Sequence, residues 1–220
     1  MLTKAEIIAV YRKRARRYDI SANLYYLIGF REMAYRSQAV QALRLRPGDT
    51  VVEVGCGTGL NLALLCRSVG TTGRVIGIDL TDQMLEQARH RIERNGWSNV
   101  ELVHTDAASY EFPSGTAGII STFALTLVPE YEHVIKRGTR ALRPAGRFVV
   151  LDLKQPERAP DWLVRLGVFL IKPFAVSIDL GERHPWEAME RHLTKTSVKQ
   201  LYLRCAYLAV GETPERHGTD

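Results

Sequence analysis

Short β-branched runs alternate with longer helical patterns between residues 50 and 153, and this alternation constrains the fold more than any other feature. The runs expected to be strands are Thr50–Val54, Arg74–Asp79, Val100–Thr105, Ala117–Thr122 and Gly146–Leu153. Strands that alternate with helices form parallel sheets, because each helix carries the chain back across the sheet. With two closing strands added, we predict an α/β fold: a single-domain, doubly wound, Rossmann-like, mostly parallel seven-stranded sheet with helices on both faces.

The segments outside this alternation are expected to be additions to one domain. A chain of 220 residues, 45% of them hydrophobic, is long enough to bury one full core. We expect an N-terminal helical lid over residues 1–45, a cofactor-binding core over 46–153 and a substrate cap over 154–195. Two closing strands, the last of them antiparallel, follow at 196–211, and a flexible tail occupies 212–220.

The net charge and the cysteine content bear on the cellular compartment, but they do not identify a binding partner. The formal net charge of +6 is compatible with nucleic acid, an anionic membrane surface or an acidic cofactor. The three cysteines form neither an even disulfide set nor a Cys-x-x-Cys pair, and the first residues lack a signal-peptide core. The most apolar stretch, 163–176, is shorter than the ~20 residues that span a bilayer. We expect a cytoplasmic protein that contacts a membrane at most peripherally.

A glycine-rich loop follows the first predicted strand. Val51–Val54 is apolar apart from Glu53 and runs into Gly55, Gly57 and Gly59, after which a helix is predicted. Glycines at this point permit a tight turn and a close backbone approach to a ligand at the carboxyl edge of the sheet. Asp79 ends the next strand, where its carboxylate can accept hydrogen bonds from both hydroxyls of a ribose. The pattern predicts a nucleotide-like cofactor.

Two common nucleotide classes fit this loop poorly. A phosphate-binding Walker loop requires Lys and then Ser or Thr after its last glycine, whereas Leu60 and Asn61 follow Gly59 here. A dinucleotide fingerprint would have its third glycine at position 60, and this chain has it one residue earlier. Both ATP chemistry and nicotinamide or flavin binding are therefore disfavoured.

Residues 51–59 read Val-Val-Glu-Val-Gly-Cys-Gly-Thr-Gly, which resembles the first motif of class I S-adenosylmethionine-dependent methyltransferases. Further stretches at 104–107, 118–125 and 141–147 are similar to later segments of that family, so the resemblance covers about residues 46–153. It implies S-adenosyl-L-methionine as cofactor and S-adenosyl-L-homocysteine as product. The resemblance and the glycine loop together predict these cofactor-binding residues: Glu53, Gly55, Cys56, Gly57, Gly59, Asp79, Leu80, Met84, Asp106, Ala107 and Thr122.

Methyl transfer from a sulfonium makes few demands on side-chain chemistry. The enzyme must align the attacking atom and exclude water, so neither a catalytic triad nor a metal is required. No metal site is predicted, because the six histidines show no close pairing. His184 is a candidate base, and a structural histidine is the competing interpretation. Tyr18, in Arg-Tyr-Asp, resembles the Tyr-Asp of small-molecule and quinone methyltransferases, which implies that it closes over the cofactor.

The acceptor is predicted to be hydrophobic. Residues 7–18 form a basic amphipathic helix, which is either a lid with a solvated charged face or a surface for anionic membranes. A second apolar stripe, 162–174, suits a cap over a greasy substrate. The Tyr-Asp start and the long segment after the fifth strand resemble the ubiquinone and menaquinone methyltransferases and bacterial phospholipid N-methyltransferases, so aminophospholipid or quinone-type acceptors are expected.

Three further observations bear on this prediction. The quinone group has Arg-Asn after the fourth strand, where this chain has Leu-Thr-Leu-Val at 125–128, and this leaves aminolipids or other hydrophobic molecules open. Nucleic acid is a disfavoured partner, since no Asn-Pro-Pro-Tyr, Asp-Pro-Pro-Tyr or Pro-Cys motif occurs at a suitable place. A cofactor-binding protein without turnover is the remaining alternative. Sequence does not indicate the oligomeric state.

Overall fold

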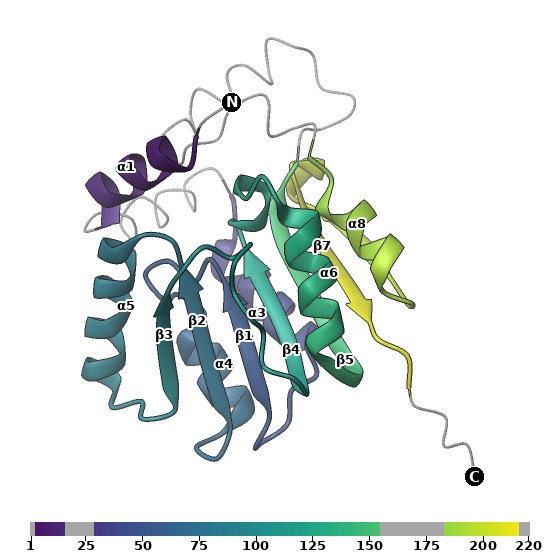
Figure 1. Cartoon of the computed structure of the whole chain (residues 1–220), viewed down its shortest axis with the longest axis horizontal. Coiled ribbons are helices and arrows are strands. Elements are labelled where there is room, and N and C mark those ends of the chain that lie inside the picture. Colours follow the sequence, from purple (N-terminus) through teal and green to yellow (C-terminus); the bar gives the residue numbers. More distant parts are fainter. Residues whose placement is uncertain (1–2, 16–28, 155–182, 216–220) are drawn as a thin grey trace.

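The computed structural model describes residues 3–15, 29–154 and 183–215 and contains a seven-stranded sheet in the order β3-β2-β1-β4-β5-β7-β6 (Figure 1). The strands are β1 (Thr50–Val54), β2 (Arg74–Asp79), β3 (Val100–His104), β4 (Thr116–Thr122), β5 (Leu142–Leu153), β6 (Ser197–Leu201) and β7 (Ala206–Glu212). β1 to β5 pair in parallel, and β7 is antiparallel to both β5 and β6. The predicted fold class and the antiparallel last strand are confirmed.

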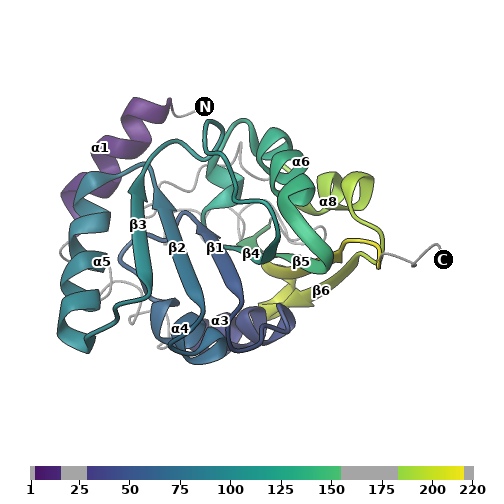
Figure 2. The same ribbon diagram turned by 60° about the horizontal axis from the view of Figure 1, so that its bottom comes forward.

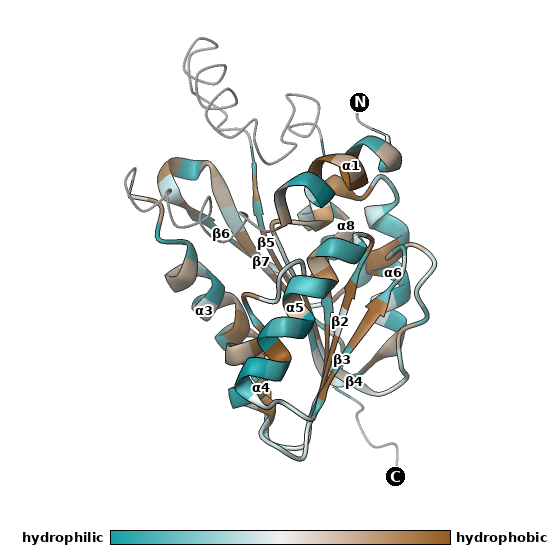
Figure 3. Ribbon diagram, turned by 90° about the vertical axis from the view of Figure 1, so that its left-hand side faces the viewer, coloured by the Kyte–Doolittle hydropathy of each residue, from teal (hydrophilic) through white to brown (hydrophobic). Residues whose placement is uncertain are grey.

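Helices cover both faces of the sheet, as Figure 2 shows. The helices of the described residues are α1 (Lys4–Arg14), α3 (Glu32–Ala42), α4 (Leu62–Val69), α5 (Asp82–Asn95), α6 (Tyr131–Ala141) and α8 (Pro185–His192), with 3-10 turns η3 (Leu125–Leu127) and η6 (Tyr202–Arg204). Alternate side chains of a strand point to opposite faces, so Val51 joins the core beneath α3, α4 and α5, and Val52 joins the core beneath α6 and α8. The hydropathy colouring places apolar strands inside and polar helix surfaces outside (Figure 3).

Two expected appendages differ from their prediction because parts of them belong to the sheet layers. α3 was expected within a lid, but its Ala39 and Val40 are buried in the core with α4. α8 was expected within a substrate cap, but its Ala188 and Met189 are fully buried in the opposite core. The lid and cap interpretations therefore apply at most to the remainder of those segments, and residues 155–182 lie outside the described part.

β3 ends at His104 and β4 begins at Thr116, each one residue from its expected bound, and two other boundaries differ by more. β5 begins at Leu142, four residues before the expected Gly146, because Leu142 pairs with Thr116 before the register shifts at a bulge. The expected tail was placed too early, since β7 continues through Glu212 and Thr213 is buried. The Thr213 N–H donates to the Gly146 carbonyl at 3.0 Å. Among the described residues, no helix has the length and apolar character needed to cross a bilayer.

Candidate functional site

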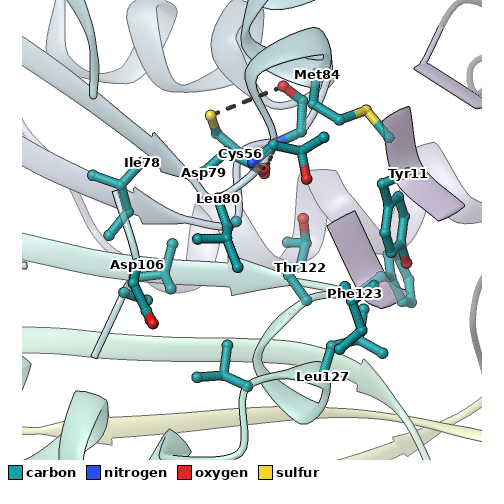
Figure 4. Close-up of a pocket in the computed structure, with 18 of the residues that line it drawn as sticks. Tyr11, Cys56, Ile78, Asp79, Leu80, Met84, Asp106, Thr122, Phe123 and Leu127 are labelled. Carbon is teal, nitrogen blue, oxygen red and sulfur yellow. Dashed lines mark hydrogen bonds between the residues drawn. The ribbon is translucent and has the colours of Figure 1, made fainter. Parts of the chain in front are cut away.

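A pocket opens at the carboxyl ends of the parallel strands, next to the point where the strand order reverses between β1 and β4. In doubly wound sheets this switch point is where ligands bind. The pocket is lined by the glycine loop, the end of β2, the loop after β3 and the exit of β4, and by α1, which lies across it (Figures 1 and 4). Nine of the eleven predicted cofactor residues line it: Gly55, Cys56, Gly57, Asp79, Leu80, Met84, Asp106, Ala107 and Thr122.

The glycine loop is shaped by close packing and by its backbone conformation. Gly55 has a φ of 69°, and a Cβ there would lie 2.4 Å from the Cβ of Ala124. A side chain at this position would therefore separate β1 from the β4 exit. Gly57 has a φ of 55° with no atom within 4 Å of its Cβ position, so its backbone lines the pocket without obstruction.

Asp79 joins the loop to the end of β2. Its two carboxylate oxygens accept hydrogen bonds from the N–H groups of Gly57 and Thr81, each at 2.8 Å. Burial raises the pKa of this carboxyl, although both N–H donors act in the opposite direction. Beside it, Leu80 and Met84 form an apolar wall (Figure 4). A carboxylate at the edge of an apolar slot is the arrangement that a ribose and an adenine ring require.

A buried arginine that the sequence did not reveal lines another part of the pocket. Arg36 of α3 pairs with Glu32, one turn away, at 2.7 Å, and its side chain is 5% exposed. The guanidinium also donates to the hydroxyl of Thr122 and lies over the ring of Phe123, 5.1 Å from the centroid. The Glu-x-x-x-Arg spacing was visible in the sequence, but its partner Thr122 lies 86 residues away.

Glu53 and Gly59, the two remaining predicted residues, stand behind the pocket. Glu53 accepts a hydrogen bond from Asn61 Nδ2 at 2.6 Å, while its Oε2 is buried without a partner among the described residues. Burial raises the pKa of Glu53 to about 7, against the lowering effect of Arg36 and Asn61. Gly59 packs on Leu62, which its Cβ would approach to 2.6 Å. Direct cofactor contact by these two residues therefore stays a prediction, and the structure shows supporting positions.

α1 is fixed over the pocket by ion pairs near both of its ends. Lys4 Nζ lies 2.6 Å from Asp106 Oδ2 and 2.9 Å from Glu130 Oε1. Arg12 Nε lies 2.9 Å from Asp82 Oδ1 at the start of α5. Partial burial would raise the pKa of Asp106, but Lys4 and the Ala108 N–H lower it overall. Ile7 and Tyr11 of α1 line the pocket beside Lys4.

The proposed catalytic residues are not brought together by the described part of the chain. His184 directly precedes α8, its side chain is 39% exposed, and its Nδ1 lies 2.9 Å from Glu187 Oε1. It does not line the pocket. Tyr18 and the 162–174 stripe lie outside the described residues. Burial raises the pKa of the Cys56 thiol well above its usual value, so Cys56 is a small loop residue here. Residues 3–15, 29–154 and 183–215 contain no cluster of three or more metal-ligating side chains.

The lining residues fit S-adenosylmethionine by their chemistry. Asp79 provides an acceptor for hydroxyl groups, and the guanidinium of Arg36 provides donors for a carboxylate. The same pocket is lined by Gly57, whose missing side chain leaves the loop open, and by the apolar side chains of Ile78 and Met84. A nucleoside with an amino-acid tail has these three parts in the same molecule.

Comparisons with known proteins agree with this chemistry. A model of the ubiE/COQ5 methyltransferase family matches residues 1–162. The demethylmenaquinone methyltransferase of Bacillus cereus is 32% identical over 149 residues, which are 67% of this chain and 62% of that protein. The match thus spans less than two thirds of the relative's length. The demethylmenaquinone methyltransferase of Bacillus anthracis strain A0248 gives the same identity and coverage.

Solved structures share the fold at low sequence identity. Phosphoethanolamine N-methyltransferase 2 of Haemonchus contortus, solved with S-adenosyl-L-methionine, has a TM-score of 0.65 at 14% identity, with 82% of this chain and 53% of that chain covered. Geranyl diphosphate C-methyltransferase of Streptomyces coelicolor has a TM-score of 0.64 at 15% identity, with 82% and 78% covered. The family match confirms the resemblance found in the sequence: this chain belongs to the ubiE/COQ5 methyltransferase family.

Proposed function

We propose that this protein transfers the methyl group of S-adenosylmethionine to a hydrophobic, lipid-like acceptor of the quinone or aminophospholipid class. The observation that carries the proposal is the joint presence of Asp79 and Arg36 in one pocket whose remaining lining is largely apolar. The acidic and basic groups match the two polar ends of the methyl donor. Family membership and the switch-point location support the same activity.

The chain's own residues would bind and orient the donor and exclude water from it. When bound, the donor supplies a methyl group already activated by its sulfonium. Asp79 accepts hydrogen bonds from the ribose hydroxyls, and Arg36, which Glu32 holds at 2.7 Å, binds the carboxylate. α1 covers the pocket through Lys4, Ile7 and Tyr11, which limits access by water.

The hydrophobic acceptor class is supported by the apolar side chains that line the same pocket. Phe123, Leu127 and Val128 follow β4, and Ile7 and Tyr11 of α1 face the same pocket. An apolar lining favours a ring or chain over a charged polymer. The named relatives that methylate demethylmenaquinone support a quinone-type acceptor.

An aminophospholipid is the second candidate, favoured by one specific departure. The Leu-Thr-Leu-Val sequence after β4 replaces the Arg-Asn of the quinone group. Of these residues, Leu125 and Thr126 are buried and Leu127 lines the pocket. A neutral primary amine attacks a methyl sulfonium with its own lone pair, so it needs less assistance from a side chain than ring carbon does.

Incubation of the whole protein with methyl-labelled donor tests both candidates. One arm contains reduced demethylmenaquinone in detergent, and the other contains vesicles of phosphatidylethanolamine and phosphatidylglycerol. We expect label in the lipid extract of one arm, with equal production of S-adenosylhomocysteine, and strongly reduced label with Asp79→Ala. Donor binding without transfer in either arm would favour the alternative of a cofactor-binding protein without turnover. Transfer to total RNA instead would contradict the acceptor class.

A further inference from the structure

The turn that follows β4 forms one wall of the pocket and is held from two directions. It comprises η3, Leu125–Leu127, and continues into Val128; Leu127 and Val128 line the pocket. Thr126 at its centre is 4% exposed and lies behind the wall. The backbone of Thr126 therefore determines where the two lining side chains stand.

The first restraint comes from β5. Asp152, 5% exposed, accepts a hydrogen bond from the Thr126 N–H at 3.0 Å through Oδ2 and one from the Leu153 N–H at 2.9 Å through Oδ1. Both carboxylate oxygens are thus used on backbone donors. Hydrogen bonds from N–H groups to an ionised carboxylate are among the stronger ones in proteins.

The second restraint comes from the segment that leads into α8. Arg183, 9% exposed, donates from Nη1 to the Thr126 carbonyl at 2.7 Å. One residue of the turn is consequently held by its N–H and by its carbonyl, from two elements far apart in sequence.

The surroundings indicate that this arrangement is more than core packing. Tyr207 pairs with Asp152 across β5 and β7, and its side chain is fully buried. The buried hydroxyl of Thr126 interacts with the Asp152 carboxyl and with the Tyr207 hydroxyl. Buried polar groups that interact with one another restrict a site to one arrangement, because a displaced member would lose its partner. The polar groups around Asp152 therefore support a single position of the turn.

We propose that Asp152 and Arg183 are positioning residues that fix the pocket wall through the backbone of Thr126. Neither side chain lines the pocket, so both act through the turn. The inference rests on the proposed function in taking this pocket as the methyl-donor site. Loss of either restraint should let Leu127 and Val128 move and should weaken ligand binding without unfolding the protein.

The test compares Asp152→Asn, Arg183→Met and the double variant in the whole protein. Asparagine keeps the size of Asp152 but replaces one acceptor oxygen with an amide donor that faces a backbone N–H. We expect each single variant to bind S-adenosylhomocysteine about tenfold more weakly by calorimetry. The double variant should be little weaker than either single one, because both restrain the same residue, Thr126. Arg183→Lys, which keeps a charged donor, should recover part of the affinity.

Asp49→Asn is the matched control. Asp49 is also a buried carboxylate, 8% exposed, that binds a backbone N–H and an arginine, but it lies before β1 at the opposite edge of the sheet. It should lower thermal stability and leave ligand affinity within twofold of wild type. The proposal is wrong if Asp152→Asn and Arg183→Met bind normally, or if Asp49→Asn weakens binding equally.

A second readout separates this proposal from the proposed function. Hydrogen exchange of the peptide containing residues 125–128 reports on the turn directly, with no ligand present. We expect at least tenfold faster exchange there in Asp152→Asn and Arg183→Met, with unchanged exchange in β1 and β2. If the wild type fails to bind S-adenosylhomocysteine, the proposed function is wrong. Faster exchange at residues 125–128 in the two variants would still support the positioning role of Asp152 and Arg183. Unchanged exchange there would overturn that role.

Discussion

A buried carboxylate lies near each end of β1, and the two carboxylates differ in how completely they are hydrogen-bonded. Asp49, just before the strand, accepts two hydrogen bonds from Arg143 at 2.7 and 3.1 Å and one from the Arg46 N–H at 2.7 Å. Glu53, near its carboxyl end, is 1% exposed and receives one bond from Asn61, while Oε2 has no partner among the described residues. Asp49 and Glu53 are thus four positions apart in the sequence. Both oxygens of the Asp49 carboxylate have hydrogen-bond donors, whereas only one oxygen of the Glu53 carboxylate has one.

The difference shows where this sheet serves stability and where it serves binding. Ligands of doubly wound sheets bind at the carboxyl ends of the strands, and there the chain keeps Glu53, Asp79 and Asp152, whose pKa values are all raised by burial. At the amino-terminal end of β1, by contrast, the buried Asp49 is paired with Arg143. Polar groups kept at a cost in folding energy tend to mark functional sites.

The largest expected effect comes from adding one carbon at the carboxyl end of β1. Gly55→Ala would place a Cβ 2.4 Å from that of Ala124 at a φ of 69°, so the loop must move. We expect S-adenosylhomocysteine binding to fall by more than about 100-fold. Gly96→Ala is the control, because Gly96 has a similar φ of 66° with nothing within 4 Å and should lose only about 1 kcal/mol of stability.

The pH dependence of unfolding should sharpen the contrast between the two carboxylates. The pKa of Glu53 is raised from 4.5 to about 7, so the folded protein retains a proton that the unfolded chain releases. Stability from this group is full below pH 4.5 and is lost as pH rises through 7, by up to about 3 kcal/mol. Glu53→Gln should remove that slope and be more stable than wild type at pH 8 in denaturant titrations.

Asp49→Asn should have the opposite sign at pH 8. It removes an acceptor from an ion pair whose Arg143 side chain is 40% exposed, so we expect a loss of about 1–2 kcal/mol. If both variants destabilise the protein equally at pH 8, the contrast between the two ends of β1 is incorrect.

Asp79→Ala should weaken S-adenosylhomocysteine binding by roughly 10- to 100-fold, since a charged hydrogen-bond acceptor contributes about 1.5–3 kcal/mol. The measurement is calorimetry, with circular dichroism to confirm the fold, because Asp79 also holds the Gly57 and Thr81 N–H groups. Asp82→Ala, three residues later and paired with Arg12 on the surface, should bind within about fivefold of wild type. Equal affinities of wild type and Asp79→Ala would remove the ribose assignment.

The smallest effect concerns α1. Lys4→Ala removes the pairs with Asp106 and Glu130, and Lys4 is 35% exposed, so affinity should fall only about two- to fivefold. The loss should shrink at 1 M salt, where exposed pairs are screened. Lys13→Ala on the same helix should have no effect. A salt-independent loss would show that Lys4 acts through packing and not through charge.

The positions of the glycine loop and of Asp79 at the strand ends could be predicted from the sequence because their determinants are local. β1 and β2 have their predicted bounds, and the glycines and Asp79 sit at strand ends that hydrophobic runs define. Arg36 was missed because its meaning depends on a partner 86 residues away, and an arginine on an amphipathic helix usually faces solvent. The positioning role of Asp152 and Arg183 was missed for the same reason. Both side chains bind the backbone of Thr126, which is distant from each of them in the sequence.

The central claim is that the pocket at the carboxyl end of β1 holds S-adenosylmethionine. Calorimetric titration of the whole protein with S-adenosylhomocysteine, alongside NADH and ATP, tests it most directly. We predict micromolar binding of S-adenosylhomocysteine at one site per chain, with at least 100-fold weaker binding of NADH and ATP. No binding of S-adenosylhomocysteine, or a preference for NADH, would contradict it.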